Sequence, residues 1–158
     1  MKLKIRKRLS AILSIIMFVS VFANSGMVVF AEEAEGINIG QENYENNEYH
    51  AVDGTAYGTI TVPEGFVFFV EDGVNVAADR IVLEGGAQLA IFGEGRFSCE
   101  NIDASDGATM LLESNVNIPS GVIVYDGEDN DISNSIYWTT ITYNAVAGKW
   151  YADNIEPT

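Results

Sequence analysis

The chain has 158 residues, a formal net charge of −15 at pH 7, an apolar fraction of 47% and one cysteine. A surface this acidic repels the phosphate backbone of nucleic acids and the headgroups of anionic membranes, so both classes of partner are excluded. A single cysteine also excludes an intramolecular disulfide.

The first 31 residues have the features of a secretory signal peptide. Five basic residues precede an apolar run from Leu9 to Ala23, and small residues before Glu32 fit a cleavage site after Ala31. Cleavage after Ala23 and an uncleaved anchor over 9–31 are the alternatives. Removal of 1–31 leaves three basic residues against 23 acidic ones, a net charge of −20. We therefore expect an extracellular protein, either secreted or held at the cell surface.

Residues 32–58 lack apolar periodicity and are rich in Glu, Asn, Gly and Tyr. Such a composition predicts a linker or a loose N-terminal cap, with a short strand near Ile37 and Ile39. The only histidine, His50, lies among polar residues here, which is typical of an exposed side chain.

From Ile60 onward the sequence repeats with a period of 21 residues. Isoleucine opens each repeat, and glycine recurs five places later; these positions are Ile60, Ile81, Ile102 and Ile123, and Gly65, Gly86 and Gly107. Apolar residues alternate at period 2 within a repeat, so the repeats are strands. A fixed period of this length is typical of a solenoid. We predict an all-β fold: a short parallel β-helix over 59–134, with three 21-residue rungs, a partial fourth and three strands in each rung.

Equivalent residues of successive rungs should stack inside this solenoid. On the second strand the inward column contains Phe68, Leu89 and Met110. The recurrent glycine should mark a corner with positive φ, which a residue with a Cβ adopts only at a cost. Cys99 falls in a column of small residues, where packing is the first interpretation and a reactive or intermolecular thiol the second.

Some second-strand residues that the alternation points outward are also apolar. They are Val67, Phe69, Ala90 and Leu111. An outward apolar strip needs a cover, either the chain's own termini or a partner. The sequence therefore predicts a monomer or weak self-association through this strip.

After Tyr125 the repeat gives way to an acidic loop that contains Asp126, Glu128, Asp129 and Asp131. Closely spaced carboxylates are the ligands that calcium prefers, so these four residues are a candidate calcium site and calcium the candidate cofactor. The spacing departs from the EF-hand pattern, and a solvated acidic loop is the alternative.

Residues 135–153 read as a β-hairpin, followed by a tail over 154–158. The hairpin is suited to cap the open end of the solenoid, which would otherwise expose core side chains. Its aromatic residues Trp138, Trp150 and Tyr151 could also form a stacking platform for sugar rings.

The pattern IxVxxGAxLxIxGxGxF, seen best in Ile81 to Phe97, resembles parallel β-helix repeats of exported proteins from Gram-positive bacteria. That group includes adhesin-like and carbohydrate-binding surface proteins and, more distantly, β-helix polysaccharide lyases and glycosidases. The resemblance implies the fold and transfers no catalytic residue.

We therefore expect a non-catalytic module that binds a glycan or a protein or acts as a spacer, and not an enzyme. The alternative is a polysaccharide-active enzyme of the glycosidase type. A lyase of this fold needs a basic groove, and the chain after residue 31 has only Arg80, Arg96 and Lys149. Three rungs also give a platform only about 15 Å long, which is short for a polymer-cleaving cleft.

Overall fold

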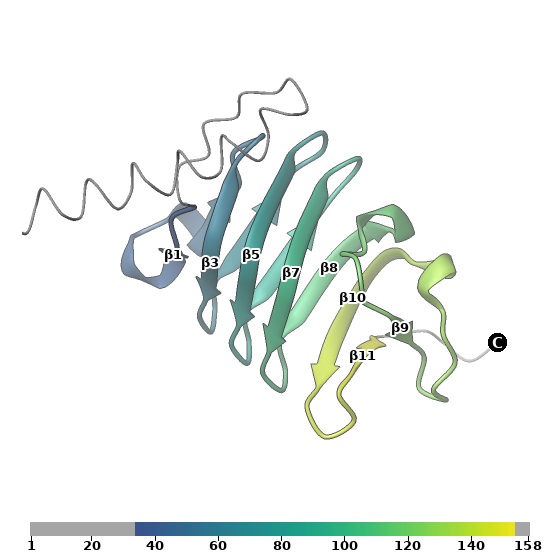
Figure 1. Cartoon of the computed structure of the whole chain (residues 1–158). Helices are drawn as coiled ribbons and strands as arrows, with labels where there is room; N and C mark the ends of the chain where they lie inside the picture. Colours follow the sequence, from purple (N-terminus) through teal and green to yellow (C-terminus); the bar gives the residue numbers. More distant parts are fainter. Residues whose placement is uncertain (1–33, 154–158) are drawn as a thin grey trace, which may run out of the picture. The chain divides into compact units, whose positions relative to one another are not determined.

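Each turn of the chain contributes one strand to each of two sheets. The computed structural model describes residues 34–153, so the predicted signal peptide over 1–31 and the tail over 154–158 lie outside the described residues. Sheet A has the strand order β1-β3-β5-β7, and sheet B has the order β2-β4-β6-β8-β10-β11-β9. Figure 1 shows β3, β5 and β7 side by side, with β10 and β11 beyond β8. The strands are β1 (Ile37–Asn38), β2 (Glu48–His50), β3 (Ala56–Val62), β4 (Val67–Val70), β5 (Asn75–Leu83), β6 (Gln88–Ile91), β7 (Arg96–Ala104), β8 (Thr109–Ser114), β9 (Val124–Tyr125), β10 (Tyr137–Asn144) and β11 (Lys149–Ala152). Short 3-10 turns lie at Ile39–Gln41, Glu45–Asn47, Asn115–Asn117 and Ser133–Ser135.

The strand register confirms the all-β parallel solenoid. Ile60 pairs with Ile81, and Ile81 with Ile102, across parallel strands of sheet A. In sheet B the predicted column of Phe68, Leu89 and Met110 forms in the same way, and all three side chains are fully buried. Each such side chain contributes roughly 1.5–3 kcal/mol on burial. The stacked columns are therefore the main source of stability.

The solenoid has about four turns, and the fourth lies at the N-terminal end. Within 32–58, the expected linker or loose cap, Ile37 pairs with Ile60 and Tyr49 pairs with Phe68. The rings of Tyr49 and Phe68 stack with their centroids 5.4 Å apart. The first turn thus continues the interior columns of the second, although its residues lie 19 to 23 positions from their partners instead of 21.

The predicted partial fourth rung at Ile123 is wrong in its placement. Ile123 is exposed, and the next residue, Val124, pairs with Trp150 in sheet B instead of continuing the isoleucine column of sheet A. The physical reason is the acidic loop that follows Tyr125, which supplies no inward apolar strand. The place beside β8 in sheet B is taken by β10, an antiparallel strand.

The third strand of each rung is not a separate element. In the first two predicted rungs it is continuous with the first strand of the next rung, so that β5 and β7 each have nine residues. In the third rung the 3-10 turn Asn115–Asn117 takes its place, and Val116 is exposed. Asp79 and Arg80 are both exposed and interrupt the inward-outward alternation of β5. Neither glycine nor proline occurs between Val76 and Ile81, so no turn residue interrupts the strand here.

The C-terminal hairpin forms as predicted, from β10 and β11. Its first strand pairs antiparallel with β8, where Ile141 lies opposite Met110. Ile141 is fully buried, and Ile136 and Val124 join the same core cluster. The hairpin thus covers the end of the interior columns.

Asn117 is a buried polar residue at the end of the third rung. Its amide nitrogen donates to the carbonyl oxygens of Gly93 and Gly95 at 2.9 and 3.1 Å. Its amide oxygen accepts from the backbone N–H of Ser114 at 2.9 Å. The side chain therefore satisfies backbone carbonyl groups of the second rung at a corner where the third rung forms a 3-10 turn instead of a strand.

Among the described residues, no helix is long and apolar enough to cross a membrane.

Candidate functional site

The outer face of sheet B carries the apolar strip that the sequence predicts. Because side chains alternate along a strand, Phe68 and Val70 point inward while Val67 and Phe69 point outward. Phe69 pairs with Ala90, and Ala90 with Leu111. Ala90 is only 1% exposed, so larger neighbours on the outer face cover its methyl group.

Those neighbours include a row of rings that crosses the sheet. The ring centroids of His50 and Phe69 lie 5.1 Å apart, those of Phe69 and Phe92 lie 4.8 Å apart, and those of Phe92 and Trp138 lie 5.1 Å apart. The planes of the last two pairs meet at 88° and 62°. We call His50, Phe69, Phe92 and Trp138 the aromatic strip. It joins four strands or corners that are far apart in the sequence.

Trp138 is the most accessible large residue of the strip, with 51% of its surface exposed. Its φ angle is +44°, although it lies inside β10. Tyr137 pairs with Ser114 and Thr139 with Leu112, which leaves Trp138 opposite Glu113. A bulky residue in the left-handed region costs about 1–3 kcal/mol and persists only where the surroundings impose it.

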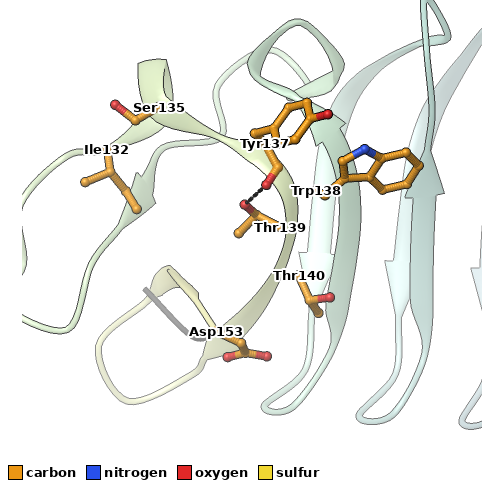
Figure 2. A pocket seen from close by; sticks show the side chains of 7 residues that line it. All are labelled: Ile132, Ser135, Tyr137, Trp138, Thr139, Thr140 and Asp153. Atoms are coloured by element: carbon orange, nitrogen blue, oxygen red, sulfur yellow. Dashed lines mark hydrogen bonds between the residues drawn. The ribbon is translucent and has the colours of Figure 1, made fainter. Parts of the chain in front are cut away.

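A shallow hollow lies beside this strand. Its volume is about 500 Å³. It is lined by Ile132, Ser135, Tyr137, Trp138, Thr139, Thr140 and Asp153. Figure 2 shows the Trp138 ring extending to one side of β10, over the neighbouring strands, while Ile132 and Asp153 lie on the other side. The indole therefore belongs to the aromatic strip more than to the hollow.

Carboxylates stand between the rings of the strip. His50 Nδ1 lies 3.0 Å from Glu71 Oε1, and His50 Nε2 lies 3.4 Å from Glu48 Oε2. Glu113 accepts a hydrogen bond of 2.5 Å from the backbone N–H of Gly93. The strip is thus an aromatic surface with an acidic border.

The other two residues of the predicted stacking platform lie elsewhere. Trp150 is only 7% exposed, and its ring packs against Tyr143 with the centroids 5.1 Å apart. Its placement in the platform is therefore wrong, because the hairpin turns this residue into the core to close the solenoid. Tyr151 is half-buried and donates a hydrogen bond of 2.6 Å to Asp129. Only Trp138 of the three offers its ring to the outer face of sheet B.

In the acidic loop, three of the four carboxylates accept hydrogen bonds from the protein itself. The pKa of Asp126 lies below its ordinary value because the side-chain amide and the backbone N–H of Asn130 donate to it, as does the N–H of Glu128. Asp131 accepts from the hydroxyl and the N–H of Ser133, which lower its pKa in the same way. These bonds fold the loop back on itself.

Asp129 links the loop to the hairpin. It accepts from the Tyr151 hydroxyl and from Lys149 Nζ at 3.2 Å, and both contacts lower its pKa. Within residues 34–153, no group of three or more His, Cys, Asp or Glu side chains is arranged to hold a metal ion. Calcium binding by Asp126, Glu128, Asp129 and Asp131 stays a prediction, and calcium would have to displace these hydrogen bonds.

Cys99 lies half-buried against the core. Its thiol donates to the Asn101 carbonyl oxygen, and burial raises its pKa. A raised pKa reduces the thiolate fraction, so this cysteine is a poor nucleophile at neutral pH. A hollow of about 340 Å³ beside it is lined by Tyr57 and by small and acidic residues, among them Ala78, Asp79 and Ser120.

Two members of the strip were not found by sequence reasoning. Phe92 follows the inward Ile91, and its position 21 residues from Glu71 and from Glu113 was the available signal. His50 was interpreted as an exposed residue of a linker, and it is exposed, but it pairs with Phe69 in sheet B. The turn that contains His50 was not recognised because His50 and Phe69 are 19 residues apart, two fewer than the 21-residue period.

The fold and this surface define a class: a parallel β-solenoid closed by an antiparallel hairpin, with an aromatic strip on the outside of one sheet. Comparison of the chain with protein-family models, with curated proteins and with solved structures found no match.

Proposed function

We propose that this protein is an exported, non-catalytic β-solenoid module that binds a glycan through the aromatic strip. The observation that supports this best is Trp138, which is half exposed and carries a left-handed backbone conformation inside a strand. Backbone strain of this kind concentrates at binding sites. This conformation places the exposed indole of Trp138 next to Phe92 at one end of the row of rings, where a ligand can reach it.

The surroundings of the strip suit a ligand with many hydroxyl groups. Gln88 and Thr109 lie side by side on the same face, joined by a hydrogen bond of 3.3 Å. Thr140 lies opposite Leu111 in the next strand. An apolar surface with a few polar side chains at its edge is the usual composition of a small-molecule site. Sugar rings have one apolar face and a polar rim, and they match this composition.

The enzyme alternative has less support. A glycosidase needs a carboxylic acid whose pKa is raised, so that it can protonate the leaving oxygen. The carboxyl groups of Asp126, Asp129 and Asp131 have lowered pKa values instead, and they accept hydrogen bonds from the protein. These three carboxyl groups are therefore poor candidates for the catalytic acid, and we propose binding without catalysis.

The proposal is tested by isothermal titration of the protein with neutral, cationic and anionic oligosaccharides. Truncation of a central tryptophan costs about 2 kcal/mol or more, which is roughly a 30-fold loss of affinity. We expect Trp138→Ala to lose at least this much for any oligosaccharide that binds.

Tyr137→Ala is the matched control. Tyr137 is the adjacent aromatic residue and is 73% exposed, but it is not part of the row of rings. Its replacement should leave the affinity within about twofold of the unchanged protein. The proposal fails if no oligosaccharide binds, or if Tyr137→Ala and Trp138→Ala weaken binding equally.

A further inference from the structure

The borders of the aromatic strip carry a charge pattern that narrows the class of ligand. Glu71, Phe92 and Glu113 occupy the same position in three successive turns, 21 residues apart. Trp138 lies opposite Glu113 in the antiparallel strand. Acidic and aromatic side chains therefore alternate along this row, about 4.8 Å from one strand to the next.

A third carboxylate adjoins the same row. Glu48 and Glu71 both contact His50, on its two ring nitrogens. One histidine carries at most one positive charge, so it cannot neutralise two carboxylates. The end of the strip at β2 thus keeps a negative charge even when His50 is protonated.

No compensating cation lies on these strands. The described strands that carry the strip, β2, β4, β6, β8 and β10, contain neither lysine nor arginine. Arg80 and Arg96 lie on β5 and β7 of sheet A, and Arg80 pairs there with Asp103. The aromatic strip therefore combines ring faces, which attract cations, with a border of uncompensated carboxylates.

We propose that the strip selects glycans that carry protonated amino groups, of the glucosamine type, over neutral glycans and over uronates. This inference rests on the proposed function and further specifies that the glycan is positively charged. An ammonium group within about 6 Å of a ring centroid is attracted by the ring, and a carboxylate one strand away strengthens the attraction. A uronate would be repelled by the same carboxylates.

The test compares four hexasaccharides by isothermal titration at low salt: a glucosamine hexamer, its fully N-acetylated form, a glucose hexamer and a galacturonic acid hexamer. We expect the glucosamine hexamer to bind at least tenfold more tightly than the two neutral ones, and the galacturonic acid hexamer not to bind. Glu71→Gln should reduce the preference at least threefold. Glu100→Gln, which removes an exposed glutamate from β7 in sheet A, should leave it unchanged.

Because the whole protein is acidic, a polycation could bind anywhere on its surface. Trp138→Ala separates the two cases, since binding at the strip requires the indole and general charge attraction does not. Equal binding of the glucosamine hexamer by Trp138→Ala and the unchanged protein would overturn the inference. Neutral hexamers that bind as tightly as the charged one would overturn it while leaving the proposed function in place. If none of the four bound at the strip, the inference would fail, and the proposed function would fail with it if the wider set of oligosaccharides did not bind either.

Discussion

Two residues with positive φ show how the backbone conformation constrains single positions of this protein. Trp138 has φ +44° within a strand, and Gly86 has φ +81° at a corner. The glycine lies where the 21-residue repeat predicts it, and the tryptophan lies where no repeat applies. Both can be tested by substitutions that separate backbone cost from side-chain contact.

For Trp138 the relevant comparison is Trp138→Gly with Trp138→Ala. Both variants remove the indole and its contact with Phe92, but only glycine relieves the left-handed conformation. In an ordinary strand glycine is less stable than alanine by roughly 0.5–1 kcal/mol. Here we expect the glycine variant to be the more stable by about 1 kcal/mol in urea unfolding. An alanine variant that is equally or more stable would show that the backbone relaxes once the indole is gone.

For the corner we expect Gly86→Val to cost about 2 kcal/mol and Gln88→Val less than about 0.5 kcal/mol in thermal melts. A Cβ at Gly86 would lie 2.9 Å from Cγ of Glu64, in addition to the cost of positive φ. Gly65→Val measures the cost of positive φ alone, since Gly65 has the same φ as Gly86 and nothing lies within 4 Å of an added Cβ. If valine were harmless at both glycines, the assignment of these corners would be wrong.

At the scale of elements, the C-terminal hairpin both closes the core and supports the strip. One face of β10 supplies Ile141 to the interior, and the opposite face presents Trp138 to the outside. The acidic loop holds β11 through Asp129, Lys149 and Tyr151. Lys149 Nζ also lies 4.7 Å from the centre of the Tyr125 ring. The loop that the sequence offered as a calcium site thus has a structural role in this arrangement.

This link predicts a pH dependence of stability. The folded state lowers the pKa of Asp129, so its contribution is present above the unfolded value of 3.8 and is lost as the pH falls through the lower, folded pKa. The raised pKa values of Lys149 and Tyr151 predict the opposite at high pH: their contribution is present below the unfolded values and is lost above the folded ones. We expect Asp129→Asn to have a lower Tm than the unchanged protein at pH 7, and the two values to converge as the pH falls through the lowered pKa of Asp129. Glu128→Gln removes the same charge from the same loop and is the control. Identical melting of Asp129→Asn and the unchanged protein at pH 7 would contradict the role of this contact.

At the scale of the whole molecule, charge opposes the association of two copies. If residues 1–31 are removed as the sequence predicts, the remaining chain has 23 acidic residues and three basic ones. Two copies that met through the aromatic strip would also bring Glu71 and Glu113 of one copy towards those of the other. Net charge of this size keeps proteins apart at low ionic strength.

We therefore expect sedimentation of a monomer at about 50 mM NaCl. If weak self-association occurs at about 500 mM NaCl, where charges are screened, Trp138→Ala should abolish it. A dimer at low salt would contradict this prediction and would favour self-association over glycan binding at the strip.

The solenoid was predictable because its signal is local and repeated. Ile60, Ile81 and Ile102 stack as their spacing indicates, and so do Phe68, Leu89 and Met110. The outward positions of Val67 and Phe69 followed from the same alternation. The turn that contains Ile37 and Tyr49 was not recognised, because its length differs from the repeat and its loops are polar.

By itself the sequence determined that strands coil in parallel and which side chains fill the interior, since both follow from a period of 21 residues and an alternation of two. Only the tertiary structure decided that Trp150 is buried while Trp138 joins Phe92 on the outer face. The physical reason is that an antiparallel hairpin ends the repeat. The direction of its side chains depends on how β10 pairs with β8. That pairing is determined by contacts between residues distant in the sequence, and no local sequence pattern predicts such contacts.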